Sequence, residues 1–364
     1  MDEPNNNPES SLSPSQEPSP APPPDLFLDS LPPAPPPPTE RGISKIFVAP
    51  NGLIRAGWGI LIFAAVIFAA GFVISHLMRL LVHSHPHQHM AIMTPRIGIL
   101  GEGLSVILIV VATGVMALIE RKSILAYGYQ AAARAVRFFS GLAWGFIAIS
   151  VLVLVLWASH LLVFDGLTIH GGAILKYGLL WGFMFLLVGI FEESIMRGYP
   201  QFTLTRGIGF WWSALIFSFL FGFGHHANPG ESPVGLFSAG AIGLVFCLSL
   251  WYTGSLWWAV GFHAAWDWGE SFFYGTSDSG LHVQGHLFSE HPVGKILWSG
   301  GATGPEGSLY IIPLILLIVL GMWLWWGRRV KSPFAGQGWV PAWIHDRLAA
   351  SSAPPESTTL PPAS

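Results

Sequence analysis

The chain has 364 residues, of which 52% are hydrophobic and only 10% are charged, and its formal net charge is −3. Because soluble domains carry about 25% charged residues, this composition excludes a soluble protein and indicates a polytopic membrane protein embedded in a lipid bilayer. No basic face that would attract a nucleic acid is visible, and the single cysteine, Cys247, excludes an intrachain disulfide and a cysteine-rich zinc site.

The N-terminal segment, residues 1–40, contains 14 prolines and neither Lys nor Arg. A segment of this composition cannot bury a core, so we expect a disordered cytoplasmic tail with polyproline II character. It also lacks the basic start and the apolar stretch of a signal peptide. A proline-rich ligand for a partner domain is the alternative interpretation.

Eight apolar segments follow, and most of them reach the roughly 20 residues that a helix needs to cross a bilayer. They predict an all-α fold, a polytopic membrane helix bundle of about eight transmembrane helices, within a domain of residues 41–331. Residues 332–364 are rich in Pro and Ser and are expected to form a disordered C-terminal tail. The predicted spans are 53–79, 98–119, 138–163, 175–197, 209–226, 233–252, 254–274 and 307–327.

The distribution of Lys and Arg predicts the orientation, because cytoplasmic loops carry an excess of both residues. With the N-terminus inside, 13 of the 17 basic residues fall on the inner side, and the outer side holds only Arg79, Arg96, Lys176 and Lys295. Both termini are therefore expected to be cytoplasmic. We expect a multi-pass protein of the plasma (inner) membrane of a bacterium.

The fourth span ends in two adjacent carboxylates and an arginine, Glu192, Glu193 and Arg197. A charge at the centre of a spanning helix costs roughly 2.5–3.5 kcal/mol, so such residues are functional candidates. Glu193 and Arg197 are four residues apart and share a helix face, which predicts an ion pair. Glu192 lies about 100° around the helix and is predicted to point toward the chemistry. The alternative is a buried ion pair that only fixes helix packing.

Two later spans carry further ionisable side chains. His225 and His226 end the fifth span, and His263 and Asp267 lie four residues apart in the seventh span. Three separate spans therefore each carry groups suited to acid–base work or to metal binding. His226 is predicted to face helix packing or the turn that follows it.

The depth of His225 poses a difficulty. Antiparallel helices of full length would place Glu192 near the inner end of its span and His225 near the outer end. We favour a fourth span that continues past Pro200 toward Leu204 as a kinked helix, because this lifts Glu192 to mid-depth. A short or tilted fifth span is the alternative.

Hydrolysis of an amide requires an activated water, a stabilised oxyanion and a proton for the leaving amine. Glu192 together with His225 could hold and deprotonate a water, and His263 could donate a hydrogen bond to the oxyanion. No Ser or Cys has the sequence context of a nucleophile. Four tryptophans could line a substrate cavity, although packing is the preferred role for them: Trp257, Trp258, Trp266 and Trp268.

The ordered set of motifs resembles that of the CAAX-protease and bacteriocin-processing family, known as CPBP or Abi. The motifs are Glu-Glu-x-x-x-Arg at 192–197, Phe-x-x-x-His at 221–225 and His-x-x-x-Asp at 263–267, within a core of residues 177–274. The resemblance implies an intramembrane endopeptidase. It also implies that Glu192 and His225 activate water, and that His263 and Asp267 form the oxyanion site.

The chain departs from the family pattern at Asp267, where many members have Asn. An ionised Asp donates no hydrogen bond, so it must be protonated, orient His263 or ligate a metal. The family includes proteins described as metalloproteases and as glutamic peptidases, so a divalent metal such as zinc stays an option. We do not favour it, because the chain has no His-Glu-x-x-His helix.

Two histidine-containing segments outside the motifs are weaker candidates for metal binding. The segment 81–97 holds four closely spaced histidines, His83, His85, His87 and His89. In the loop 275–306, His282 and His286 have ligand spacing, but Gly280 and Gly285 argue against the helix that this would need. We interpret this loop as a lid over an outer cavity.

The function predicted from the sequence is an endopeptidase that acts on a membrane-associated protein or peptide. Its predicted catalytic set is Glu192, Glu193, Arg197, His225, His263 and Asp267. A catalytically silent membrane scaffold or a peptide-toxin immunity protein is the alternative. A proton-coupled transporter is a third interpretation, which the lack of a corresponding motif pair in the two halves disfavours.

Overall fold

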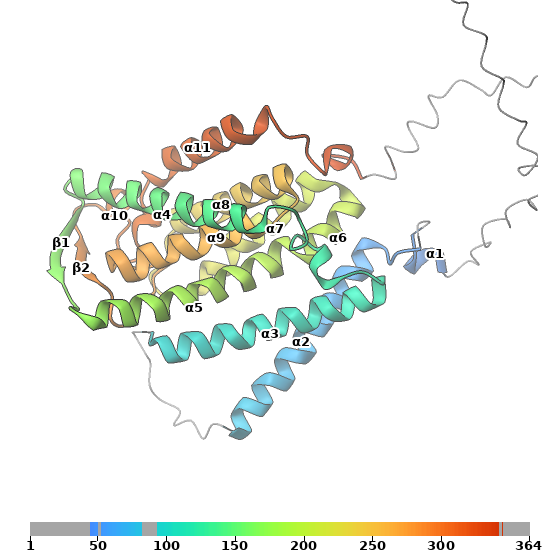
Figure 1. Ribbon diagram of the computed structural model, residues 1–364, viewed down its shortest axis with the longest axis horizontal. Helices are drawn as coiled ribbons and strands as arrows, with labels where there is room; N and C mark the ends of the chain where they lie inside the picture. The colour runs from blue at the N-terminus through green and yellow to red at the C-terminus, as the bar shows by residue number, and fades with distance from the viewer. Residues whose placement is uncertain (1–43, 50–51, 82–92, 342–343, 345–364) are drawn as a thin grey trace, which may run out of the picture. The chain divides into compact units, whose positions relative to one another are not determined.

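The computed structural model describes residues 44–49, 52–81, 93–341 and 344. The proline-rich segment 1–40, most of the histidine-rich segment 81–97 and residues 345–364 lie outside this range, so the predictions for them stay predictions. Within the described residues, the fold is a bundle of apolar helices with a single small sheet (Figure 1).

Each of the eight predicted spans contains a helix. Short 3₁₀ helices connect or follow the longer elements: η1 (Ile124–Ala126), η2 (His225–Ala227), η4 (Pro305–Gly307) and η6 (Ala335–Gln337). The main elements in chain order are α1 (Ser44–Phe47), α2 (Ala56–Leu81), α3 (Pro95–Glu120), α4 (Arg134–Ala158), β1 (Leu162–Leu167), α5 (Gly172–Arg197), α6 (Tyr199–Ile208), α7 (Phe210–Gly224), α8 (Pro233–Thr253), α9 (Trp257–Asp267), η3 (Trp268–Tyr274), β2 (Phe288–Pro292), α10 (Ile296–Ser299), α11 (Ile311–Met322) and η5 (Trp323–Gly327).

Five helices are long and apolar enough to cross a bilayer by their length and composition: Ala56–His76, Pro95–Glu120, Arg134–Ala158, Gly172–Ile208 and Pro233–Thr253. The other apolar helices are shorter. Large apolar side chains such as Phe68 and Leu118 are exposed, at 78% and 81% of their surface. In a membrane, such side chains face lipid, where the helical backbone is satisfied internally. The chain is therefore a polytopic helical membrane protein, as the composition predicts.

The fourth span continues beyond the glutamates, as expected. Helix α5 ends at Arg197, Gly198 forms a break, and α6 begins at Tyr199, so that residues 172–208 together form one apolar span. Because α6 continues the span beyond the break, Glu192 lies well inside the span instead of at its end. Proline lies at the second position of α6, where its missing N–H would have no partner in any case.

Helices α4 and α9 pack against each other through glycines. A Cβ atom on Gly141 or Gly145 of α4, or on Gly261 of α9, would come within 2.2 Å of a carbonyl oxygen of the facing helix. Such small residues let helix backbones approach closely inside a membrane. Helix α5 lies on the other side of α9, where Gly189 faces the backbone of Val260. Figure 1 shows α5 between α3 and α9.

The two strands form an antiparallel pair at one end of the bundle, beside the start of α5 (Figure 1). The sequence prediction of a helix to residue 163 was wrong here, because α4 ends at Ala158 and β1 begins at Leu162. His160 has a φ of +58°, a left-handed conformation that does not continue a right-handed helix. Residues of the predicted lid loop, 275–306, supply β2, the partner strand.

The described part of the predicted C-terminal tail is packed, contrary to expectation. Ser332 donates a hydrogen bond of 2.6 Å from its hydroxyl to the carbonyl oxygen of Trp251. Phe334 is buried beside Phe210, and Trp339 packs against the rings of Trp211 and Trp212. Phe210, Trp211 and Trp212 thus form an apolar surface on which the tail packs. The Pro- and Ser-rich composition of the tail did not indicate this contact.

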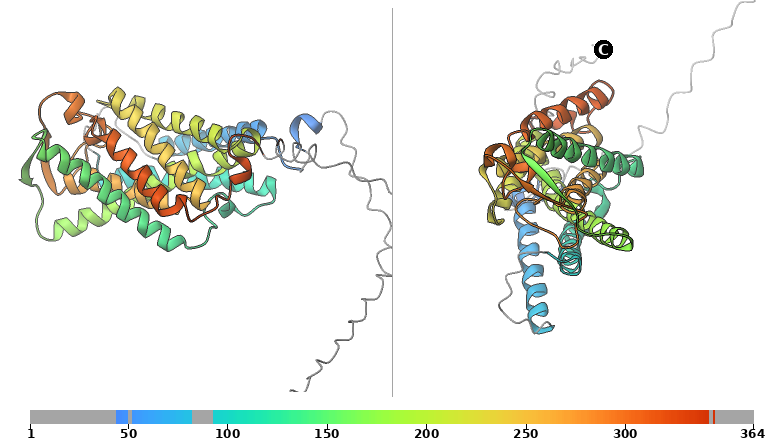
Figure 2. Two further views of the ribbon diagram at one scale, coloured as in Figure 1. Left: turned by 90° about the horizontal axis from the view of Figure 1, so that it is seen from above. Right: turned by 90° about the vertical axis from the view of Figure 1, so that its left-hand side faces the viewer.

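The loops predicted for the inner side of the membrane and those predicted for the outer side lie at opposite ends of the bundle. At one end, Arg206 of α6 and Lys122 after α3 both pair with Glu120, at N–O distances of 2.6 and 3.1 Å. At the other end, β1 pairs with β2, and Met93 forms a bridge with Val283. Figure 2 shows the helices running between these ends. The loops assigned to the inner side thus meet at one end, and those assigned to the outer side meet at the other.

Candidate active site

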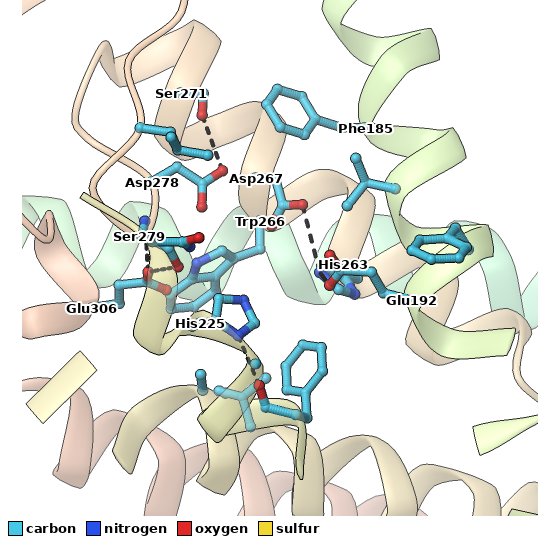
Figure 3. A pocket seen from close by; sticks show the side chains of 18 of the residues that line it. Phe185, Glu192, His225, His263, Trp266, Asp267, Ser271, Asp278, Ser279 and Glu306 are labelled. Atoms are coloured by element: carbon cyan, nitrogen blue, oxygen red, sulfur yellow. Dashed lines mark hydrogen bonds and ion pairs between the residues drawn. The ribbon is translucent and has the colours of Figure 1, made fainter. Parts of the chain in front are cut away.

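A cavity of about 360 Å³ lies between α5, α7, α8, α9 and the loop that follows η3. Its lining includes Glu192 from α5, His225 after α7, and His263 and Asp267 from α9. Figure 3 shows these side chains around one space. Residues from all three sequence motifs therefore share one cavity.

Glu193 and Arg197 form the expected ion pair. Both side chains are fully buried, and Arg197 Nη1 lies 3.1 Å from Glu193 Oε1. The guanidinium also lies over the ring of Phe221, 4.4 Å from its centroid. Gly243 of α8 makes room for it, because a Cβ atom there would lie 2.6 Å from Arg197 Nη2. Removing the Glu193 carboxylate would leave the Arg197 guanidinium buried without a counter-charge.

His263 links the two adjacent glutamates. Its Nδ1 lies 3.1 Å from Oε1 of Glu193, and its Nε2 lies 3.5 Å from Oε2 of Glu192. A carboxylate accepts hydrogen bonds only, so the proton on Nδ1 is donated to Glu193. Glu193 thereby fixes the orientation of the ring. The Nε2 atom is left facing the cavity side, where Glu192 is partly exposed.

Asp267 lies on the same side of the imidazole as Glu192. Its Oδ2 is 3.6 Å from His263 Nε2, a distance within ion-pair range but longer than a hydrogen bond. Asp267 also lines the cavity (Figure 3). The carboxylate thus lies close enough to His263 to influence the orientation of its ring, which is one of the three roles that the sequence left open.

His225 is held by the end of its own helix. Its Nδ1 lies 2.8 Å from the carbonyl oxygen of Phe221, which can only accept, so Nδ1 carries the proton. In the neutral ring, Nε2 is then the atom with a free lone pair. Among the described residues, no hydrogen bond or ion pair joins His225 to Glu192 directly. Both side chains line the cavity, so the expected difference in depth does not separate them.

Several other residues from the sequence analysis lie away from the cavity lining. His226 lies outside the described cavity lining, but it is exposed and stacks on the exposed ring of Phe223 instead of packing between helices as predicted. Of the four tryptophans, only Trp266 is part of the described lining. His282 and His286 make separate hydrogen bonds, to Ser277 and to the Val283 carbonyl.

The side chains of Ser194 and Cys247 form hydrogen bonds to neighbouring helix residues. Ser194 Oγ lies 2.6 Å from the hydroxyl of Tyr129 and donates to the carbonyl of Ile190. Cys247 is fully buried and donates from Sγ to Oε1 of Gln201 at 3.3 Å. Neither side chain forms part of the described cavity lining. The serines that do line it, Ser238, Ser271 and Ser279, donate their hydroxyl protons to the Glu306 carbonyl oxygen, to Asp278 and to the Glu306 carboxylate, and none of these hydroxyls bonds to a motif histidine.

The sequence analysis missed three acidic residues of the cavity wall, Glu102 of α3, Asp278 and Glu306. Burial and the nearby Glu306 raise the pKa of Asp278 to about 7. Asp278 and Glu306 lie in the loop that was predicted to cover an outer cavity, and the loop residues Ser279 and Leu281 line the cavity too. An acidic residue in a loop gives no sequence signal by itself, because most such residues face water.

Comparison with known proteins assigns the motif region to a family. The model of the type II CAAX prenyl endopeptidase Rce1-like family matches residues 174–269. The matched region covers most of the motif core, residues 177–274. The match includes Glu192, His225, His263 and Asp267, as the motif resemblance predicts, and ends before Asp278. No curated protein and no solved structure matches the chain.

Proposed function

We propose that the chain is an intramembrane endopeptidase that hydrolyses a peptide bond of a membrane-associated protein or peptide. The observation that carries this proposal is the shared cavity of Glu192, His225 and His263 within a region that matches a family of endopeptidases. The proposed nucleophile is a water molecule that Glu192 and His225 hold in that cavity.

In the proposed reaction, the oxygen of this water attacks the carbonyl carbon of the scissile amide, and its proton passes to the Glu192 carboxylate. His225 Nε2 accepts a hydrogen bond from the same water and orients it. The carbonyl oxygen becomes an oxyanion and accepts a hydrogen bond from His263 Nε2–H. When the C–N bond breaks, the proton on Glu192 passes to the leaving nitrogen.

The buried residues around His263 support its role in this scheme. Glu193 accepts from Nδ1, so the other nitrogen is the one directed to the cavity. Asp267 and Glu192 lie 3.6 and 3.5 Å from that nitrogen, on the cavity side of the ring. Arg197 holds Glu193 in turn. Glu193 and Arg197 therefore act by positioning His263 and do not touch the substrate.

The four motif residues do not fit a zinc site in this arrangement. Zinc requires three or four donor atoms grouped around one point. Among the described residues, the only such group of three or more His, Cys, Asp or Glu side chains is formed by Glu270, Asp278 and Glu306. Glu192, His225, His263 and Asp267 form no such group, which favours the glutamic-type reaction over a metal-dependent one.

The predicted location of both termini in the cytoplasm also indicates which side of the membrane the cavity faces. Its wall includes loop residues from the end of the bundle that carries β1 and β2. With both termini cytoplasmic, this end is the outer one, so the substrate would be cleaved toward the outer side of a plasma membrane. The apolar part of the lining, which includes Phe185, Phe221 and Trp266, suits an apolar substrate segment.

The purified full-length protein in lipid nanodiscs, incubated with a library of membrane-spanning peptides with and without a chelator, tests the proposal. Cleavage that survives a zinc-selective chelator and is lost in Glu192→Gln would support it. Glu290→Gln is the matched control, because it removes an acid outside the described cavity lining. Unchanged cleavage in Glu192→Gln would refute the proposed role, and a wild type that binds the peptides without cleaving them would favour the scaffold alternative.

A further inference from the structure

Three acidic side chains that the proposed reaction does not use meet in one place. They are Glu270 of η3, Asp278 of the loop that follows it, and Glu306 of η4 (Pro305–Gly307). One carboxylate oxygen from each lies within 4.8 Å of the others. Figure 3 shows Asp278 and Glu306 on the side of the cavity away from Glu192, with Trp266 between.

Glu270 has no hydrogen-bond partner in this cluster. Its side chain is fully buried, and neither of its carboxylate oxygens is hydrogen-bonded to any described residue. A buried carboxylate without a partner costs several kcal/mol. Native structures therefore rarely leave one unpaired unless a water or an ion completes the site.

The other two carboxylates are anchored by neutral donors. Asp278 Oδ2 accepts from the hydroxyl of Ser271 at 3.0 Å, and Glu306 Oε1 accepts from the backbone N–H and the hydroxyl of Ser279. Among the described residues, no Lys, Arg or His forms an ion pair with any of the three acids.

The backbone around the cluster is closely packed. Gly304 has a φ of +110°, and a Cβ atom at this position would lie 2.1 Å from the carbonyl oxygen of Ser277 and 3.3 Å from Glu270 Oε1. A glycine thus lets the segment before Glu306 approach the buried carboxylate. Asp278 and Glu306 also line the cavity, so an ion has a route to the cluster and waters can complete its shell.

We propose that Glu270, Asp278 and Glu306 bind a calcium ion. The donors are all oxygen atoms, which hard cations such as Ca²⁺ and Mg²⁺ prefer and which suit zinc less well. Calcium accepts an irregular shell of six to eight oxygens at about 2.3–2.6 Å, whereas magnesium requires a near-ideal octahedron at about 2.0–2.1 Å. Three carboxylates from three separate segments, with water completing the shell, fit the more permissive ion.

The bound ion would join η3, which carries Glu270, to the loop that carries Asp278 and to the loop segment around η4, which carries Glu306. These loops form one wall of the cavity, so the ion would fix this wall in place. This role is separate from the water activation proposed for Glu192 and His225. It therefore holds or fails independently of the proposed peptidase activity.

Terbium luminescence on the full-length protein in detergent, stripped with a chelator and dialysed, tests the site directly. Tb³⁺ replaces Ca²⁺ at oxygen sites and emits when a nearby tryptophan is excited, and Trp266 lies beside the cluster (Figure 3). We expect emission that added Ca²⁺ displaces. Trp266→Phe should weaken the emission while leaving the Ca²⁺ concentration needed for displacement unchanged.

Substitution of the ligands supplies the second measurement. Glu270→Gln and Asp278→Asn should each raise the Kd for Ca²⁺ at least tenfold, whereas Glu290→Gln, an acid outside the cluster, should leave it unchanged. Millimolar Ca²⁺ should also raise the Tm of the wild type by a few degrees and that of Glu270→Gln by much less. The Ca²⁺-dependent Tm and terbium emission of the wild type test the proposal even if a ligand variant fails to fold.

Two results would overturn the proposal. One is a wild type whose Tm and terbium emission do not respond to Ca²⁺, which would mean that the three acids share protons instead. The other is displaceable terbium emission of equal strength and affinity in Glu270→Gln, which would place the ion elsewhere.

Discussion

Nδ1 of His263 lies 3.1 Å from Oε1 of Glu193, while Nε2 of the same ring lies 3.5 Å from Oε2 of Glu192. Two glutamates adjacent in sequence thus contact opposite sides of one imidazole. Glu193 is fully buried with Arg197, and Glu192 is 29% exposed at the cavity. The geometry separates a residue that holds the histidine from one that can reach a substrate.

The first prediction compares substitutions of these two glutamates. Glu193→Gln should lower the free energy of unfolding by about 3–5 kcal/mol, because it leaves Arg197 buried without its counter-charge. Glu192→Gln should leave folding nearly unchanged while abolishing hydrolysis. Thermal unfolding and peptide cleavage, measured on the same preparations, separate the two effects. If Glu192→Gln is the less stable protein, the two roles are reversed.

The helices and the local pairs of the site were predictable, because they depend on local sequence. The i,i+4 spacing of Glu193 and Arg197 required only a helix, and it produced the ion pair. The contact between Glu193 and His263 joins positions 70 residues apart. It depends on how α9 packs against α5, which hydropathy does not encode. The motif resemblance implied that the three motifs act together, but it did not predict this contact.

The acidic cluster shows the same limit more strongly. Glu270, Asp278 and Glu306 come from η3, a loop and η4, and no spacing rule joins them. The packing of Phe334 against Phe210 was hidden in the same way, because the composition of residues 332–364 indicated only a tail. In both cases, the tertiary contact decides the structure and the local sequence is neutral or misleading.

The second prediction concerns the glycine contact between α4 and α9. Gly145→Ala should destabilise the bundle by about 1–3 kcal/mol, because the new Cβ atom would lie 2.2 Å from the Phe262 carbonyl oxygen. Gly103→Ala in α3 is the control, since nothing lies within 4 Å of its Cβ position. This control should be neutral or slightly stabilising. Equal melting temperatures for both variants would contradict the close packing.

The third prediction concerns orientation. Reporter fusions after Arg41 and after Lys331 should both report a cytoplasmic location, because the bias of Lys and Arg places both ends of the domain inside. A reporter inserted after Pro292, at the end of β2, should report the opposite side. A split result for the two ends would overturn the predicted number of spans.

The fourth prediction concerns Glu290 of β2, which lies opposite Phe164 in the strand pair. Burial raises the pKa of Glu290 from its ordinary value of 4.5 to about 7, and Asp165 adds to this effect. The folded chain then holds this proton more tightly than the unfolded chain. Its contribution to stability is therefore fully present below about pH 4.5 and is lost as the pH rises through about 7.

Glu290→Gln removes this titration and keeps a neutral side chain. The variant should match the wild type at pH 4.5 and exceed it at pH 8.5 by on the order of 1 kcal/mol, a modest value because the side chain is partly exposed. Ser289→Ala, beside it in β2, should change stability equally at both pH values. Chemical unfolding at the two pH values measures this. A stability difference that does not change with pH would refute the prediction.

The last prediction concerns Asp267 and His263. His263→Ala should lower the cleavage rate by about 10²–10³-fold, the usual effect of removing one oxyanion donor. Asp267→Asn should keep partial activity, because an amide at this position can itself donate a hydrogen bond and Glu193 still fixes the ring through Nδ1.

The metal-dependent alternative predicts a different pattern for the same variants. If Asp267 were a metal ligand, Asp267→Asn would bind metal weakly, and added zinc would restore its activity. Cleavage assays on Asp267→Asn with a chelator, without addition and with zinc distinguish the two. Partial activity that is insensitive to both additions supports the role of Asp267 beside His263. A variant that is inactive without zinc and restored by zinc would rule that role out, since the 3.6 Å contact between Asp267 and His263 would then reflect two ligands of one ion.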